Sequence, residues 1–253
     1  MNKLLKQLHK AGVHGIKSNK EIILEVLEDQ LHNEREIDAL LYKLLMNVKG
    51  QKQVIFQCPH ELLAKLDNIQ KMMTVEGERV IYIRSLAVPI EIQALSFEIW
   101  PATEEKAISF FAEVMRKSVQ DAHAFLNAMK EELPTQVDNM FTVYLVNGKP
   151  AGIVLPHIEP DTDREGRMFW IGLNPSYRGK GLGKNLHMIG LYRLQKEFKA
   201  KSYLGSTQID NYPMRNIMAG NGCIEKNTVV SLKYNYELDE ENSRATEADT
   251  ESI

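Results

Sequence analysis

Apolar and polar residues follow two different periods along the first 95 residues. Residues 1–18 are basic and interrupted by Gly12 and Gly15, which predicts an arm or short helix followed by a loop. Ser18 and Asn19 can cap a second helix. Its apolar residues recur at helical spacing: Ile22, Ile23, Val26, Leu27 and Leu31. A further helical pattern covers residues 34–48. Strand-like runs at 53–57 and 78–88 flank another helical stretch at 60–73.

The pattern from residue 96 onward alternates between strands and helices in a longer series. Residues 96–100 predict a strand, and two helices follow between Pro101 and Pro134. Three strand-like runs come next, at 140–146, 151–158 and 167–173, and Asn147-Gly148 predicts a hairpin turn between the first two. A helix at about 183–199, a strand at 203–208, a helix at about 212–220 and a strand at 227–236 complete the series. This order predicts an α+β fold.

The chain is expected to divide into three parts. Residues 1–95 form a small N-terminal α+β domain of unassigned role, and residues 96–238 form a larger domain. Residues 239–253 are polar, acidic and without periodicity, which predicts a disordered tail. From Glu237 to Ile253 there are seven acidic residues and one basic residue, Arg244.

Composition restricts the class of protein. Of 253 residues, 43% are hydrophobic and 26% are charged, which is typical of a globular protein. The net charge of −3 argues against a protein that coats nucleic acid. The helices predicted at 19–48 could form a DNA-binding helix-turn-helix, but residues 1–95 carry 13 Lys and Arg against 12 Asp and Glu. That near balance argues against a nucleic-acid partner.

The two cysteines, Cys58 and Cys223, indicate neither a disulfide framework nor a four-thiolate metal site. Such sparse use fits a reducing cytoplasm. The seven histidines are scattered without metal-ligand spacing, so we expect no metal. No stretch is long and apolar enough for a membrane span, and the N-terminus does not resemble a signal peptide. We therefore expect a cytoplasmic protein without a membrane partner.

A glycine-rich turn between a strand and a helix is the most informative segment for chemistry. It reads Arg178-Gly179-Lys180-Gly181-Leu182-Gly183-Lys184. Glycines let a ligand approach the backbone N–H groups, and the helix start adds its positive dipole end. The alternative is a plain tight turn with solvated cations. The spacing fits neither the dinucleotide fingerprint nor the phosphate loop of nucleoside triphosphatases.

The segment IGLNPSYRGKGLGKNL resembles the acetyl-CoA signature of the GNAT superfamily of N-acetyltransferases. The core pattern Arg/Gln-x-x-Gly-x-Gly/Ala falls on Arg178, Gly181 and Gly183. The resemblance extends from about Ser96 to Tyr236, where the order of elements also agrees with the family. It implies a mixed, mostly antiparallel central sheet flanked by helices.

The resemblance also implies positions for acetyl-CoA. Backbone groups of Ile171, Gly172 and Leu173 would contact the pantetheine arm. The loop would hold the pyrophosphate. Asn211 stands where the family often has an asparagine that contacts the cofactor arm. The loop residues implied as cofactor-binding are Arg178, Gly179, Lys180, Gly181, Leu182, Gly183 and Lys184.

The sequence departs from the family at its proton-transfer positions. Met218 occupies the place of the tyrosine that often protonates the leaving thiolate. Arg167 stands where some relatives have a glutamate base, and an arginine stays protonated. Glu165, Glu159 and His157 are the remaining catalytic candidates, each weighed against a surface role. A water chain could also act as the base.

Two functions remain open from the sequence. The first is transfer of an acetyl group from acetyl-CoA to a primary amine of a small molecule, peptide or protein by direct attack. The second is a CoA-binding or acyl-CoA-binding sensor with little turnover, which the missing tyrosine and glutamate suggest. A homodimer is compatible with either function.

Overall fold

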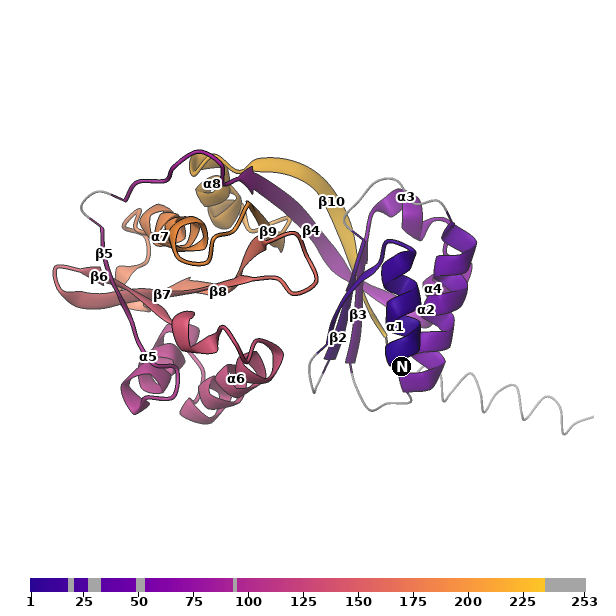
Figure 1. Cartoon of the computed structure of the whole chain (residues 1–253), viewed down its shortest axis with the longest axis horizontal. Coiled ribbons are helices and arrows are strands. Elements are labelled where there is room, and N and C mark those ends of the chain that lie inside the picture. Colours follow the sequence, from indigo (N-terminus) through magenta and orange to yellow (C-terminus); the bar gives the residue numbers. More distant parts are fainter. Residues whose placement is uncertain (18–20, 27–32, 49–52, 93–94, 235–253) are drawn as a thin grey trace, which may run out of the picture. The chain divides into compact units, whose positions relative to one another are not determined.

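The computed structural model describes residues 1–17, 21–26, 33–48, 53–92 and 95–234. The fold is α+β, with helices packed on mostly antiparallel strands, as predicted (Figure 1). The pairs β2 with β3 and β8 with β9 are parallel. The predicted acidic tail at 239–253 lies outside the described residues.

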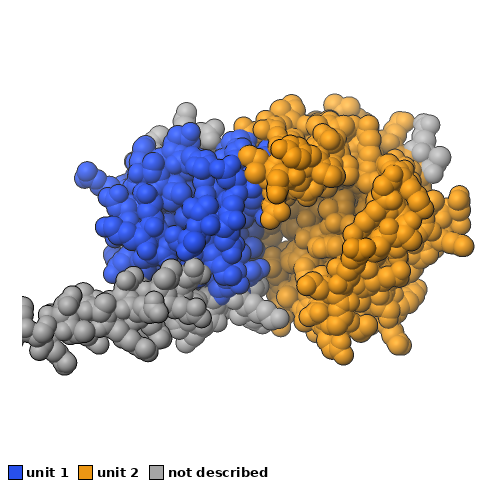
Figure 2. Space-filling model, turned by 180° about the vertical axis from the view of Figure 1, so that it is seen from behind, with its two compact units in different colours: residues 1–80, 227–253 blue, residues 81–226 orange. Residues whose placement is uncertain are grey.

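Two compact units divide the chain (Figure 2). Unit 1 contains residues 1–80 together with 227–253, and unit 2 contains residues 81–226. The predicted division after residue 95 differs from this one for a topological reason. Strands β4 (Met73–Ser85) and β10 (Ile224–Tyr234) each pass from one unit into the other. A contiguous N-terminal domain is therefore not the compact unit, because its sheet needs a strand from the end of the chain.

Unit 1 is a sheet covered by helices. Its strand order is β1-β2-β3-β10, in which β3 pairs parallel with β2 and antiparallel with residues 230–233 of β10. The elements of this unit that precede β4 are α1 (Asn2–Lys10), β1 (His14–Lys17), β2 (Glu21–Glu25), α2 (Glu34–Val48), β3 (Gln53–Cys58), α3 (His60–Leu63) and α4 (Asp67–Met72). The expected helix at 60–73 is thus two short helices.

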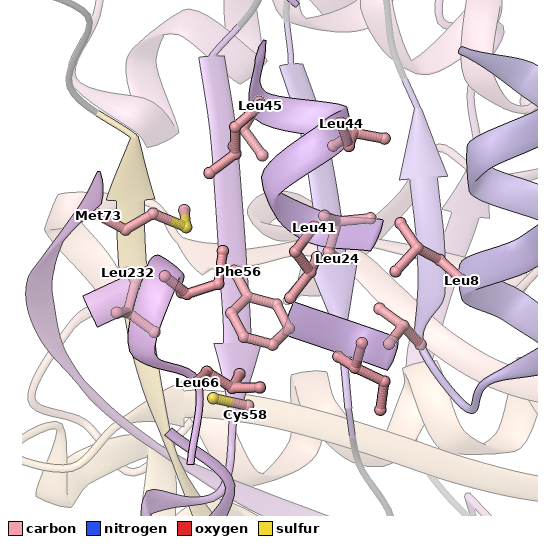
Figure 3. Close-up of a cluster of buried hydrophobic side chains, with 14 of the residues drawn as sticks. Leu8, Leu24, Leu41, Leu44, Leu45, Phe56, Cys58, Leu66, Met73 and Leu232 are labelled. Atoms are coloured by element: carbon pink, nitrogen blue, oxygen red, sulfur yellow. The ribbon is translucent and has the colours of Figure 1, made fainter. Parts of the chain in front are cut away.

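Buried hydrophobic side chains from both the N-terminal and the C-terminal part of the chain make the core of unit 1 (Figure 3). Phe56 of β3 lies at its centre, with Leu41 of α2 and Leu66 beside it. Leu232 of β10 belongs to the same cluster. Asp38 is buried at the edge of α2, where its carboxylate accepts bonds from the backbone N–H groups of Asn68 and Ile69 at 3.2 Å each. This carboxylate therefore fixes α4 against α2.

The predicted helix at 19–31 is wrong, because residues 21–25 form strand β2. Ile22, Leu24 and Val26 are fully buried, which is the period of a strand. The same short apolar run also fits helical spacing, and such a run is ambiguous until its partner is known. That partner is β3, about thirty residues away, so the helix-turn-helix alternative loses its first helix. Leu27 and Leu31 lie outside the described residues.

Unit 2 holds the remaining elements in the predicted order. Its strand order is β4-β9-β8-β7-β6-β5. Strand β4, which precedes the predicted larger domain at 96–238 in the sequence, is therefore the neighbour of β9. The elements are β5 (Ser96–Ile99), α5 (Glu105–Met115), α6 (Val119–Glu132), η1 (Val137–Asn139), β6 (Thr142–Val146), β7 (Lys149–Ile158), β8 (Glu165–Leu173), η2 (Pro175–Tyr177), α7 (Gly183–Lys196), β9 (Ser202–Gln208) and α8 (Tyr212–Gly220).

Helices cover both faces of the unit 2 sheet. Leu186 and Ile189 of α7 pack with Val154 of β7 on one face. On the other face, Phe111 of α5 meets Trp170 of β8 edge to face, with ring centroids 5.0 Å apart. Helix α6 covers the same face, as Figure 1 shows.

Candidate acetyl-transfer site

Strand β8 carries a bulge in the middle of the sheet. Val154 of β7 pairs with Ile171, whereas Pro156 pairs with Met168. One residue of β7, Leu155, therefore lies opposite two residues of β8, Phe169 and Trp170. Their rings contact aromatic side chains of α6 and α5, respectively. A bulge changes which side chains face each side of a strand, and bulges are frequent at functional sites.

The ladder between β8 and β9 is short. These parallel strands pair only at Glu165 with Ser202 and at Gly166 with Tyr203. From residue 167 to 173, β8 therefore has backbone N–H and C=O groups on this side that β9 does not pair. This stretch includes Ile171, Gly172 and Leu173, whose backbone groups the family resemblance implies as contacts of the pantetheine arm. Unpaired groups on an inner strand are available to an extended ligand.

The glycine-rich loop follows directly after β8. Gly179 and Gly181 both have φ of +73°, and an added Cβ at either would meet nothing within 4 Å. Positive φ favours glycine, and the open space allows close approach to the backbone. Helix α7 begins at Gly183, with Leu182 as its N-cap. No side chain caps this helix, and its first turn contains Lys184 but no acidic residue. Its N-terminus is thus suited to an anion.

Arg178 and Lys180 are bound to backbone carbonyl groups of the protein. Arg178 Nε donates to Leu173 O at 3.0 Å, and its Nη2 donates to Val114 O at 3.1 Å. The guanidinium therefore joins the end of β8 to the end of α5. Lys180 Nζ donates to Ser176 O at 2.8 Å and lies over the Tyr177 ring. Arg178 therefore anchors the loop to two elements, whereas the bond of Lys180 is exposed and stays within the loop region.

Buried Asn174 fixes the start of the loop. Its Oδ1 accepts a bond from Ser176 N at 3.0 Å, and its Nδ2 donates to Glu113 Oε1 at 2.8 Å. Asn211 has a comparable role at α8: its Oδ1 accepts from Met214 N, and its Nδ2 donates to Thr207 Oγ1 at 3.0 Å. The side chain expected near the cofactor arm is therefore the N-cap of α8.

The three candidate bases lie together with Arg167. His157 and Glu159 are both buried, and His157 Nε2 is 3.3 Å from Glu159 Oε2. Glu165 begins β8, so it shares a face with Arg167, as the sequence allowed. Arg167 Nε donates to Glu165 Oε1 at 2.7 Å and is 3.7 Å from Glu159 Oε2. The cluster contains two carboxylates, one guanidinium and one imidazole.

A second buried polar network lies under the start of α7. Asn221 Nδ2 is 3.0 Å from His187 Nδ1 and donates to Lys184 O at 2.9 Å. His187 Nε2 is 3.2 Å from the Tyr203 hydroxyl, which lies 3.9 Å from the sulfur of Met218. Sequence reasoning missed this network, because its members come from α7, β9 and the end of α8. Met218, in the place of the expected tyrosine, is fully buried beside it.

Burial controls the titration of this network. It lowers the pKa of His187 to about 3, and Arg84 adds to that effect. Burial also raises the pKa of the Tyr203 phenol, and it raises the pKa of the Cys223 thiol to about 11 although Arg84 opposes this shift. His187 is neutral and Cys223 stays a thiol at physiological pH. The network therefore supports the loop without carrying charge on these side chains.

Two negative findings concern the described part of the chain. Its His, Cys, Asp and Glu side chains form no group of three or more that could hold a metal ion. Its helices include none of the length and apolarity required to cross a membrane.

Comparison with known proteins identifies the class. Residues 100–219 match the model of the acetyltransferase (GNAT) family. These residues begin just before α5 and end in α8, so they include β8, the glycine-rich loop and α7. The chain therefore contains a domain of the GNAT family, which is a family of acyltransferases, and acetyl transfer is its general chemistry.

Solved structures share the fold at low sequence identity. A GCN5-related N-acetyltransferase from Sphaerobacter thermophilus has a TM-score of 0.57 and 11% identity, covering 88% of this chain and 76% of its own. One from Kribbella flavida has a TM-score of 0.57 and 14% identity, covering 92% and 94%. A tandem GNAT protein from the clavulanic acid biosynthesis pathway has a TM-score of 0.56 and 16% identity, covering 85% and 75%. Among curated proteins, none matches the sequence significantly.

Proposed function

We propose that this protein transfers an acetyl group from acetyl-CoA to a primary amine by direct attack. The observation that carries the proposal is the end of the β8–β9 ladder beside an uncapped, glycine-rich helix start. Unpaired backbone groups of residues 171–173 can hold the pantetheine arm, which has amides of its own. N–H groups from Gly179 to Lys184 can hold the pyrophosphate.

The reaction places specific demands on these residues. Backbone N–H groups of β8 would donate to the thioester carbonyl oxygen, where negative charge develops during attack. The attacking amine must be neutral, so a base has to take a proton from the ammonium form. Met218 has no proton to give to the leaving thiolate, and therefore water would supply that proton.

The two cysteines, both buried and reduced, support a cytoplasmic location.

The experiment has a binding step and a turnover step. A ligand that binds only the folded state raises the melting temperature by mass action. We expect CoA and acetyl-CoA to raise it, and we expect free CoA thiol to be released from acetyl-CoA in the presence of a panel of primary amines. If neither ligand shifts the melting temperature at millimolar concentration, the proposed site is wrong.

The second candidate is a CoA-binding sensor without robust turnover. The specific observation behind it is Met218, which is buried where relatives often carry a tyrosine that protonates the leaving thiolate. This function predicts the same melting shift with acetyl-CoA. It differs in predicting no thiol release above the rate without amine, whichever amine is supplied.

A further inference from the structure

One nitrogen of His157 is buried without a partner. The residue is 3% exposed, and among the described residues Nδ1 has no hydrogen-bond partner. Leaving a buried polar atom without a hydrogen bond is energetically costly, and such atoms are rare in native proteins. The other nitrogen, Nε2, faces the carboxylate of Glu159 at 3.3 Å.

The carboxylate determines which nitrogen carries the hydrogen. A carboxylate accepts hydrogen bonds, so the neutral imidazole places its N–H at Nε2 and leaves the lone pair on Nδ1. An imidazole that one carboxylate orients in this way can take up a proton at its second nitrogen, and the resulting imidazolium is stabilised by the same carboxylate. The unpaired atom is thus the basic one.

The surrounding strands hold the ring in place. The Phe169 ring packs edge to face against it at 5.7 Å, and Arg167 is its partner across the β7–β8 ladder. The side chain of Gln136 makes two bonds of 2.8 Å to the backbone of Ile158, which fixes the end of β7. The charged groups that face His157 are Glu159, Arg167 and, beyond Arg167, Glu165.

We propose that His157 is the general base of this acetyltransferase and that Glu159 is its positioning residue. This inference rests on the proposed function. The acceptor ammonium gives one proton to His157 Nδ1 through a water relay, because Nδ1 is buried, and the freed nitrogen lone pair forms the bond to the acetyl carbon. The carbon–sulfur bond breaks, and the second nitrogen proton ends on the sulfur of CoA. Glu165 serves instead to hold Arg167.

The test compares a strongly basic acceptor with a weakly basic one. Benzylamine is protonated at neutral pH and needs a base, whereas benzhydrazide is already neutral. We expect His157→Gln to lower kcat about 10²–10⁴-fold with benzylamine but less than about tenfold with benzhydrazide. In the plot of kcat against pH with benzylamine, the decline toward acidic pH should disappear in the His157→Gln variant. His123→Gln, which changes an exposed histidine on α6, is the matched control and should behave as wild type.

Two further measurements keep the inference testable if His157→Gln folds poorly. Glu159→Gln should weaken kcat with benzylamine more than with benzhydrazide, while the melting shift with CoA is kept. Nitrogen NMR of the wild-type imidazole should show Nδ1 without hydrogen and Nε2 with it.

Three results would overturn the assignment. The first is an equal loss for both acceptors in a variant that binds CoA, which indicates a structural role. The second is a proton on Nδ1 of the neutral ring. The third is wild-type protein that binds CoA but acetylates neither these acceptors nor any other amine; the amine acceptor of the proposed function then fails as well. When the wild-type protein acetylates an amine, only the first two results can arise. They refute the role of His157 and leave the proposed function intact.

Discussion

Replacing Gly181 by aspartate should weaken CoA binding through charge. The residue has φ of +73°, and the space around its Cβ direction is open, so the new carboxylate would extend toward the proposed pyrophosphate position. Two unit charges about 5 Å apart repel by about 3 kcal/mol at an effective dielectric constant of about 20. Screening at physiological ionic strength reduces this value. We therefore expect the Kd of CoA to rise by about 30- to 100-fold.

Gly148 offers a matched control for backbone strain. It has the same φ of +73° and the same open surroundings, but it lies in the turn between β6 and β7. Gly148→Asp should cost a similar amount of stability and leave CoA affinity unchanged. Lys180→Ala should also have little effect, because Lys180 donates to the carbonyl oxygen of Ser176. Calorimetric titration of all three variants with CoA provides the measurement. Equal affinities for Gly181→Asp and Gly148→Asp would refute the phosphate-binding loop.

Three further outcomes follow from buried groups. Met218→Tyr should lower the melting temperature without increasing the release of CoA thiol. Met218 is fully buried against Tyr203, so a larger ring overpacks that site. Faster thiol release would show that a proton donor to the thiolate was missing. Asp38→Ala removes bonds to Asn68 and Ile69, so the free energy of unfolding in urea should fall by about 2–4 kcal/mol, whereas exposed Asp67→Ala should change it little. The folded state lowers the pKa of His187 from 6.5 to about 3, so the unfolded chain binds more protons between these values. Stability should therefore decline as pH falls through that window, and a His187→Gln variant with an unchanged pH dependence would contradict this explanation.

Local sequence was sufficient for most elements of the GNAT segment. Helices α7 and α8 and strands β7 and β8 lie within a few residues of their predicted positions, because turn signals such as Asn147-Gly148 separate them clearly. Partners distant in sequence were not predictable. Strand β2 was expected as a helix because its parallel partner follows a helix of fifteen residues.

The same difference between local signals and partners distant in sequence applies to the candidate site. The glycine-rich loop is a short-range pattern, so the sequence alone predicts its position between β8 and α7. The network of Asn221, His187 and Tyr203 needs three elements to meet, so no local pattern indicates it. The cation roles also differ from expectation, since Arg178 bonds to the carbonyl groups of β8 and α5. One of these partners, the carbonyl group of Val114, is 64 positions away in the sequence, so no local pattern indicates it.

The return of β10 to unit 1 affects how the protein can form during synthesis. Strand β3 ends at Cys58, but its antiparallel partner is residues 230–233, more than 170 positions later. The β3 edge and the apolar side chains that Leu232 covers stay exposed on the ribosome until β10 emerges. Closing such a loop is slow compared with local pairing. The N-terminal part therefore cannot complete its fold first, and a nascent chain that stalls before residue 230 presents an open strand edge to chaperones and to other chains.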